Sequence, residues 1–456
     1  MTVLRIDRAV DLWAIARELG DSRVALLDNP GSPSRLGDTS YLGLFPQEEL
    51  RVGHDADPAL VFAGLAELAR PREDNHEGPS LQSGLIGYLA YELLHGIEPA
   101  VPRSAAPTPV GDLAHFVRFA VIVAVDSAVG CTWICGDDDR RVAEARELVD
   151  SAPVREDLEI PARATGVFGL SELRACGLEP VTDPSGYRRL VDRSREEISA
   201  GRFFEVCLTQ EFNATVGADG RALYDILRAS NPAPMGAYLR ADQLEVLCTS
   251  PERLVSVSAG GAVETRPIKG TRPRSSDPAE DRHLREALAA SPKDRAENTM
   301  IVDLARNDLG RVCQTGSVAV PELCVVESYA SVHHLVSTVR GQLRPGMGPT
   351  DVIRACFPGG SMTGAPKVEA MRMISEVEQS QRGIFSGAIG WIGDDGAMDL
   401  NIVIRTLIKH GDQLSMHTGG AVTSDSDSDA EYAETMDKAR VLATSVAAAS
   451  ARTVKA

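Results

Sequence analysis

Lysine is scarce in this sequence. Only six of the 456 residues are lysines, at positions 269, 293, 367, 409, 438 and 455, whereas arginine occurs 41 times. Arginine therefore carries most of the positive surface charge. Because lysine can lose its proton and arginine cannot, a lysine inside a turn rich in glycine and proline is a candidate for an amine nucleophile or a base.

Long apolar runs and paired cysteine motifs are also missing. The longest apolar run, 119–125, is far shorter than the ~20 residues that cross a membrane. Arg5, Asp7 and Arg8 interrupt the apolar core that an export signal needs. The eight cysteines form no Cys-x-x-Cys pair, which favours reduced thiols. We therefore expect a cytoplasmic protein without a membrane segment.

Positive charge is outweighed by negative charge. The chain has 47 Lys and Arg residues against 65 Asp and Glu residues, a formal net charge of −18, and 43 % of its residues are hydrophobic. This composition is typical of a globular protein. The negative field disfavours non-specific binding to nucleic acid or to an anionic membrane, so an anionic substrate needs a local cationic pocket or a metal ion.

The pattern of apolar residues divides the chain in two. Residues 1–150 predict short strands between polar loops, at 25–27, 85–91, 116–125 and 132–135. A proline-containing connector follows at 151–169. We therefore expect an N-terminal region of residues 1–165 and a second region of residues 166–456.

The second region mixes helices and strands. Periodicity predicts a helix over 184–200 and strands at 203–212, 244–248, 254–257 and 262–265. Ser291 and Pro292 have the residue types of a helix N-cap and first position, and Gly310 can end that helix. A further helix is predicted from Asp429 to about Ala449.

Two of these predicted helices carry spaced carboxylates. Asp294 and Glu297 are three residues apart, as are Glu431 and Glu434, so each pair projects from one helical face. Brought together, the two faces would hold a hard divalent cation through oxygen ligands. The alternative is two solvated acidic faces.

Lys269 lies in a basic segment, 266–274, that also contains Arg266, Arg272 and Arg274. It is either a solvated basic turn or a site where neighbouring positive charge and partial burial lower the lysine pKa and create a nucleophile. Taken singly, other residues are equally open. Glu252 is a surface partner of Arg253 or an acid, and His334 is a core histidine or a ligand.

Longer strings, taken together, narrow these alternatives. They are SPERL at 250–254, RPIKGTRPR at 266–274, KDRAENTMIVDLARNDLGRV at 293–312, VHHLVSTVRGQL at 332–343, FPGGSMTGAPKVEAM at 357–371 and EYAETMDKAR at 431–440. In this order they resemble the chorismate-utilising enzymes over about residues 195–445. The resemblance implies an α/β fold in which two facing β-sheets are flanked by helices, as in anthranilate synthase component I, with the N-terminal segment interwoven.

The N-terminal part resembles the same family through LLDNPGS at 26–32 and GLIGYLAYEL at 84–93. In related anthranilate synthases this part and the segment matching 231–239 build a tryptophan pocket. Met235 stands where an aromatic residue is usual, and Asp28 where glutamate is usual. The candidate residues for such a pocket here are Leu27, Asp28, Ser32, Asn231, Pro232 and Met235.

One position separates the reactions within the family. Anthranilate synthases carry alanine in their PIAGT string, and isochorismate synthases have PLAGT with a catalytic lysine in an earlier strand. This chain has Lys269 in PIKGT and Glu205 in the earlier strand. The combination resembles the aminodeoxychorismate synthase component I branch. The alternatives are anthranilate synthase component I and a non-catalytic, tryptophan-binding regulatory subunit.

The resemblance also implies roles for individual residues. Lys269 would add to chorismate while Glu252 protonates the departing hydroxyl. Mg²⁺ would bind Glu297 and Glu434, with Asp294 and Glu431 holding its waters. The implied substrate-binding residues are Thr271, His334, Arg405, Gly419, Gly420 and Lys438.

The source of nitrogen is a further expectation. None of the cysteines lies in the Gly-x-Cys-x-Gly elbow of a glutaminase, so ammonia would come from solution or from a separate glutamine amidotransferase subunit, component II. The resemblance places the product in para-aminobenzoate and folate biosynthesis, where a separate aminodeoxychorismate lyase would consume it.

Overall fold

The computed structural model describes residues 1–20, 23–30, 35–69, 78–156, 158, 166–329 and 332–453. The predicted boundary at 165/166 falls beside residues outside this description. The helices, including the short 3-10 segments η1 and η2, are α1 (Leu12–Glu18), α2 (Ala59–Leu68), η1 (Tyr91–Leu93), α3 (Leu94–Ile97), α4 (Asp139–Ser151), α5 (Leu170–Ala175), α6 (Pro184–Ser199), α7 (Gly220–Ser230), α8 (Pro278–Ala290), α9 (Pro292–Gly310), α10 (Pro349–Cys356), η2 (Gly360–Met362), α11 (Lys367–Val377) and α12 (Ser428–Thr453).

The strands alternate with these helices along the chain. They are β1 (Thr2–Ile6), β2 (Arg23–Asp28), β3 (Thr39–Val52), β4 (Gly84–Leu89), β5 (Ala114–Asp126), β6 (Cys131–Gly136), β7 (Glu179–Pro180), β8 (Glu205–Thr215), β9 (Met235–Ala241), β10 (Leu244–Ser250), β11 (Arg253–Val257), β12 (Ala262–Thr265), β13 (Ile268–Pro273), β14 (Ala319–Ser328), β15 (Val332–Gln342), β16 (Gly364–Ala365), β17 (Ala388–Gly393), β18 (Met398–Asn401), β19 (Thr406–His410) and β20 (Gln413–Val422).

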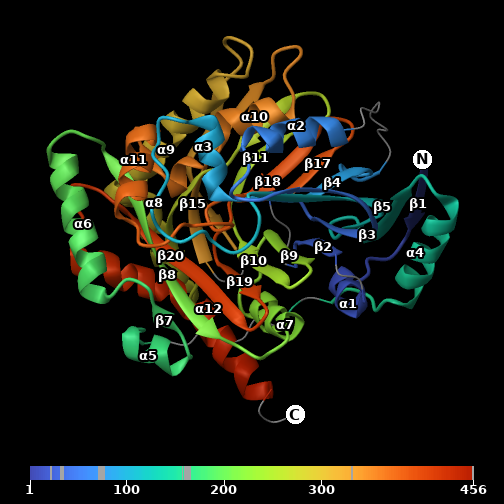
Figure 1. Ribbon diagram of the computed structural model, residues 1–456, viewed down its shortest axis with the longest axis horizontal. Coiled ribbons are helices and arrows are strands. Elements are labelled where there is room, and N and C mark those ends of the chain that lie inside the picture. The colour runs from blue at the N-terminus through green and yellow to red at the C-terminus, as the bar shows by residue number, and fades with distance from the viewer. Residues whose placement is uncertain are drawn as a thin grey trace.

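All twenty described strands belong to one hydrogen-bonded network in which neighbours are antiparallel. From one end it runs through β14, β15, β12, β11, β18, β17, β4 and β5. It continues through β3, β2, β9, β10, β19, β20 and β8. Figure 1 shows the long strands β3 and β5 connecting the two halves.

The network folds so that its two halves face each other. One buried apolar cluster contains Leu239 and Val246 from β9 and β10 together with Ile86 and Trp391 from β4 and β17. Burying these side chains between the halves removes apolar surface from water, the main driving force for such packing. The expected α/β fold of facing sheet layers with helices outside is confirmed, although the layers are joined through β3 and β5.

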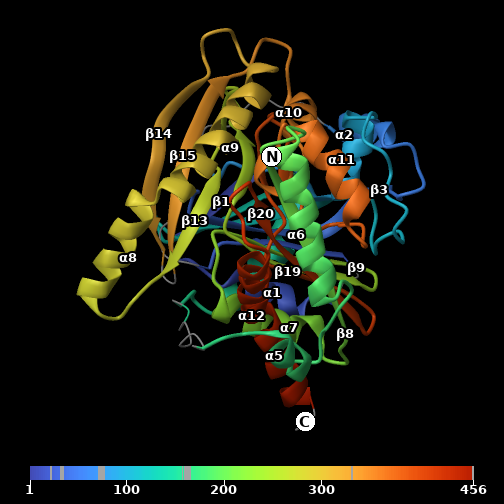
Figure 2. The same ribbon diagram turned by 90° about the vertical axis from the view of Figure 1, so that its left-hand side faces the viewer.

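The helices cover the outer faces. In Figure 2, α8 and α9 lie beside β13 and β15, and α12 lies near β20. The predicted N-cap of α9 is confirmed, because the Ser291 side chain accepts a hydrogen bond from the backbone N–H of Asp294. No helix of the described residues is long and apolar enough to cross a membrane.

One predicted element is wrong. The segment 266–274 was expected to be a turn because of its glycine and prolines, but Ile268–Pro273 forms the strand β13 on β15. The strand accommodates Lys269 and Gly270 by a shift of register between Ile268 and Thr271. Gly270 has φ +87°, and a Cβ there would lie 2.8 Å from Asp294 Cγ, so glycine is needed for both backbone and space.

A buried ion pair joins the N-terminal strands to the later ones. Arg118 in β5 donates two 2.8 Å hydrogen bonds to the carboxylate of Asp394, directly after β17. Each side chain is 4 % exposed. Removing one partner of such a pair leaves the other charge buried.

We expect Arg118→Leu to lower the free energy of unfolding by about 3 kcal/mol, measured from urea denaturation curves. The control Arg146→Leu removes an arginine whose 2.8 Å pair with Asp150 lies in α4 with both side chains about half exposed, and it should cost less than about 1 kcal/mol. Equal losses in the two variants would contradict the structural role of Arg118.

Candidate active site

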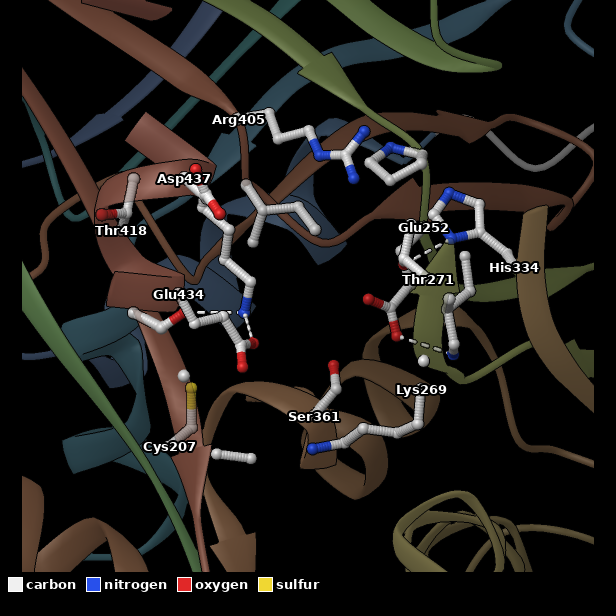
Figure 3. Close-up of a pocket in the computed structure, with 18 of the residues that line it drawn as sticks. Cys207, Glu252, Lys269, Thr271, His334, Ser361, Arg405, Thr418, Glu434 and Asp437 are labelled. Carbon is white, nitrogen blue, oxygen red and sulfur yellow. Dashed lines mark hydrogen bonds and ion pairs between the residues drawn. The ribbon is translucent and has the colours of Figure 1, made fainter. Parts of the chain in front are cut away.

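A cavity of about 530 Å³ lies between β13, β20, α9 and α12. In Figure 3, Glu252, Lys269, Thr271 and His334 lie on one side of it, opposite Cys207, Thr418, Glu434 and Asp437. The predicted site residues that line the cavity are Glu252, Lys269, Thr271, Asp294, Glu297, His334, Arg405, Gly419, Gly420, Glu434 and Lys438. The structure therefore brings together residues that are up to 186 positions apart in the sequence (252 to 438).

Lys269 is the buried amine of this cavity. It is 9 % exposed, and its Nζ lies 2.6 Å from Oε1 of Glu205, which has no exposed surface. Lys269 comes from β13 and Glu205 from the first position of β8. The ammonium and the carboxylate are thus a fully desolvated pair with good hydrogen-bond geometry.

The pKa of Lys269 differs from the sequence prediction. Burial lowers it, but the carboxylates of Glu205 and Glu297 outweigh burial and raise the pKa of Lys269 above its ordinary value. The alternative in which this pKa is lowered is therefore wrong, because Glu205 lies in direct contact with the amine. The neighbouring arginines are themselves paired with carboxylates. These pairs are Arg266 with Glu327, Arg272 with Asp294 and Arg274 with Asp281.

Glu252 faces the same space and is 5 % exposed. Its Oε1 accepts a hydrogen bond from the backbone N–H of Ile268. Burial raises the pKa of Glu252 to about 7, against the lowering effect of that N–H and of Lys269, so the group can carry a proton near neutral pH. It is not the partner of Arg253, which binds Asp399 and Glu264.

The two carboxylate faces meet across the mouth of the cavity. Glu297 on α9 is 12 % exposed and Glu431 on α12 is 4 % exposed, and the Nζ of Lys293 lies 3.9 Å from both carboxylates. Glu434 is paired with Lys438 at 2.8 Å. The alternative of two fully solvated acidic faces is therefore wrong for Glu297 and Glu431.

The four carboxylates have the donor chemistry of a hard cation site. Burial raises the pKa of Glu297 to about 7, and burial together with the charge of Glu434 raises the pKa of Glu431. Glu297 Oε1 and Glu431 Oε2 are buried without a hydrogen-bond partner. No group of three or more His, Cys, Asp or Glu side chains is already gathered as a metal site in the described part of the chain, but the unsatisfied oxygens fit Mg²⁺.

The remaining predicted residues contribute polar and cationic groups. The Thr271 hydroxyl and Nδ1 of His334 are 2.9 Å apart and hydrogen-bonded, across directly paired positions of β13 and β15. His334 is both buried and part of the cavity wall. It is therefore a core histidine that also faces the cavity. Lys438 donates to the carbonyl of Gly419 at 2.9 Å, and Arg405 lies at the upper end of the cavity in Figure 3.

Several cavity residues were not predicted from the sequence. They are Cys207, Asn231 (expected in a different pocket), Ser361, Thr418 and Asp437. Ser361 and Asp437 lie inside the strings at 357–371 and 431–440, so those strings held a signal. Cys207 lies on β8, two residues after Glu205. Side chains two residues apart on a strand point to the same face, but only the direction of β8 in the structure shows that this face is turned toward the site.

The predicted tryptophan pocket is only partly brought together. Leu27, Asp28 and Met235 line a separate cavity of about 170 Å³, whereas Asn231 lines the larger one. Pro232 lines neither cavity, and Ser32 lies outside the described residues. The carboxylate of Asp28 accepts a 2.5 Å hydrogen bond from Arg228 Nε, which satisfies an acidic group that an amino-acid ligand would use. Tryptophan binding here stays a prediction.

Comparisons with known proteins agree with this geometry. The model of the chorismate binding enzyme family matches residues 24–444. The chain is 48 % identical over 433 residues to the aminodeoxychorismate synthase of Streptomyces pristinaespiralis, covering 93 % of the chain and 57 % of the relative. The chain thus spans little more than half of that relative's length.

Two further similarities cover most of both chains. Aminodeoxychorismate synthase component 1 of Escherichia coli K12 is 48 % identical over 402 residues, 86 % of this chain and 83 % of the relative. The crystal structure of anthranilate synthase component I from Streptococcus pneumoniae aligns with a TM-score of 0.75 at 28 % identity, over 90 % of this chain and 93 % of that chain.

We expect Glu252→Gln to stabilise the protein at alkaline pH. The pKa of Glu252 is raised from 4.5 to about 7 in the folded protein, so the folded state binds its proton more tightly. Stability present below pH 4.5 is therefore lost as the pH rises to about 7. The amide avoids this loss, so the variant should gain about 3 kcal/mol over the wild type at pH 8 and almost nothing at pH 4.5.

Thermal or urea unfolding at several pH values measures this effect. The control Glu147→Gln changes an exposed carboxylate on α4 and should be neutral at each pH. A variant less stable than the wild type at pH 8 would contradict the assignment of a buried, proton-binding Glu252.

Proposed function

Because the chain belongs to the family of chorismate binding enzymes, we propose that it is an aminodeoxychorismate synthase component I, which converts chorismate and ammonia into 4-amino-4-deoxychorismate in the cytoplasm. One observation carries this proposal. A buried lysine, Lys269, and a proton-bearing carboxyl group, Glu252, face one cavity large enough for a small dianion.

The reaction follows from what these two groups can do. Glu252, with its raised pKa, gives a proton to the 4-hydroxyl as that group leaves. The amine of Lys269 forms a bond to C2 of the ring at the same time. Ammonia then forms a bond to C4 and the C2–N bond breaks, which releases Lys269. The enolpyruvyl ether is untouched throughout.

Cationic side chains hold the substrate. Arg405 and Lys438 lie in the cavity wall and are suited to the carboxylates of a dianion. Thr271 and His334 offer hydrogen bonds from the opposite wall. Glu297 and Glu434 would hold Mg²⁺ with Asp294 and Glu431 behind them, and the ion would supply positive charge for a substrate carboxylate.

Lys269 also separates this proposal from the main alternative. An anthranilate synthase loses the enolpyruvyl group and has no need of a nucleophilic amine at this position, whereas here the amine is buried in the cavity. Nitrogen would come from a glutamine amidotransferase partner, component II, because no glutaminase elbow occurs in the sequence. A separate lyase would use the product for para-aminobenzoate and folate synthesis.

The product identifies the reaction. With chorismate, Mg²⁺ and an ammonium salt at about pH 8.5, we expect a compound with an amine at C4 and an intact enolpyruvyl ether, detected by liquid chromatography and mass spectrometry, with no pyruvate. Glutamine should replace ammonium only after an amidotransferase is added. Pyruvate formed in step with a fluorescent aromatic product would instead establish anthranilate synthesis.

We expect Glu297→Gln and Glu434→Gln each to lower Mg²⁺-dependent turnover by a factor on the order of 10² or more, because an amide replaces a carboxylate ligand. Folding, followed by circular dichroism, should be retained. Glu280→Gln on the exposed face of α8 is the control. Unchanged turnover and an unchanged Mg²⁺ requirement in both variants would refute the metal assignment.

A further inference from the structure

Glu205 is a buried carboxylate that the proposed reaction has not yet used. Its side chain has no exposed surface and is absent from the cavity wall, which Lys269 and Cys207 form at this point. The cavity therefore presents Lys269, and Glu205 lies behind it, where Oε1 accepts a 2.6 Å hydrogen bond from Lys269 Nζ.

The fold holds Glu205 in this position. β8 pairs with β20 on one side, where Val206 lies opposite Val422, and with β16 on the other, where Glu205 lies opposite Ala365. A Cβ on Gly364 would lie 2.0 Å from the carbonyl oxygen of Glu205. Only a glycine allows this close approach, so the backbone that carries the carboxylate is fixed between two strands.

Lys269 cannot act as a nucleophile while it is an ammonium ion. Burial favours its neutral form, but Glu205 and Glu297 hold the proton on the amine. A charged pair can become a neutral pair by moving one proton across the 2.6 Å hydrogen bond, and burial favours neutral groups on both sides. Oε2 of Glu205 has no hydrogen-bond partner among the described residues, so no hydrogen bond from them stabilises the charged carboxylate through that oxygen.

The other groups around Lys269 are poorer acceptors. Glu297 on α9 lies beyond ion-pair distance from Lys269 and is a proposed metal ligand. Burial raises the pKa of the Cys207 thiol on β8, which keeps that thiol protonated. Glu252, after β10, must carry a proton to the leaving hydroxyl and so cannot first take one from the lysine.

We propose that Glu205 is a positioning residue that accepts a proton from Lys269 Nζ and returns it when the ring releases the lysine. The neutral Nζ then uses its electron pair for the bond to C2, while the C4–O bond breaks and the oxygen takes the proton of Glu252. When ammonia adds to C4, the electrons of the C2–N bond return to Nζ, and Glu205 gives back its proton. The new C4 ammonium loses a proton to Glu252, which restores the starting state.

This inference rests on the proposed function and is tested through the covalent adduct. The full chain is mixed with chorismate and Mg²⁺ without ammonia and quenched at a series of times between pH 6.5 and 8.5. Intact mass then measures the fraction joined to the ring. Because its acceptor is internal, the wild type should form the adduct at a rate that follows only the protonation of Glu252, nearly constant below the pKa of that group at about 7 and falling above it. Lys269→Ala should form none.

Glu205→Gln keeps a hydrogen-bond acceptor of the same shape but cannot take the proton. We expect its adduct to form at least tenfold more slowly at pH 7, and the ratio of its rate to the wild-type rate to rise steeply with pH, because in the variant the proton of Lys269 must leave to solvent. Glu205→Asp keeps a carboxylate and should restore the wild-type pH profile at a lower rate. The matched control Glu92→Gln changes a buried carboxylate outside the cavity wall and should behave as the wild type does.

The outcomes separate the two proposals. A Glu205→Gln protein that forms the adduct at the wild-type rate with the wild-type pH profile overturns the role of Glu205 and leaves the reaction intact. A change of pH profile in Glu205→Gln that Glu205→Asp shares overturns it as well. A wild type that makes the aminated product without any adduct overturns the nucleophilic lysine and the role of Glu205 together, whereas release of pyruvate overturns the proposed function itself.

Discussion

The chemistry of the cavity depends on burying several carboxyl groups beside one buried amine. Glu205 and Glu252 are each at most 5 % exposed, and Lys269 is 9 % exposed. Burial disfavours charge, so the pKa of Glu252 rises to about 7 while Glu205 remains paired with the lysine. Glu252 can therefore donate a proton, whereas Glu205 binds and orients the amine of Lys269. The two carboxyl groups differ because only Glu205 lies within hydrogen-bond distance of the lysine.

The sheet makes this arrangement possible because distant strands end at one place. β8 brings Glu205, β13 brings Lys269 and the segment between β10 and β11 brings Glu252. Asn298 on α9 has no exposed surface and donates to the carbonyls of Pro267 and Leu335, just before β13 and within β15. The helix that carries Glu297 is therefore fixed directly to the strands that carry Lys269 and His334, which limits how far the two can move apart.

Local sequence signals were sufficient where the decisive interaction is local. The start of α9 was predictable because Ser291 caps a backbone N–H only three residues away, and the spacing within α12 placed Glu431 and Glu434 on one face. β13 was missed because its partner β15 lies more than 60 residues later and overrides the turn preference of glycine and proline. The direction of the Lys269 pKa was missed for the same reason, since Glu205 is 64 residues away. The roles of individual site residues were inferred from the long sequence strings that resemble the family, because hydrophobic periodicity predicts helices and strands but no reaction.

The net charge of −18 makes binding of a dianion a problem of local balance. Lys293 and Lys438 are about half exposed and lie against the proposed metal carboxylates, at 3.9 Å from Glu297 and Glu431 and at 2.8 Å from Glu434. If a divalent cation takes these carboxylates, each lysine loses its carboxylate partner, and attraction to a substrate carboxylate replaces that contact. Under the proposed function, metal and substrate would then favour each other's binding, because each removes charge that the other would meet unpaired. An acidic chain with few lysines can thereby bind an anion, provided that a cation releases the half-exposed ammonium groups of Lys293 and Lys438 from their carboxylates.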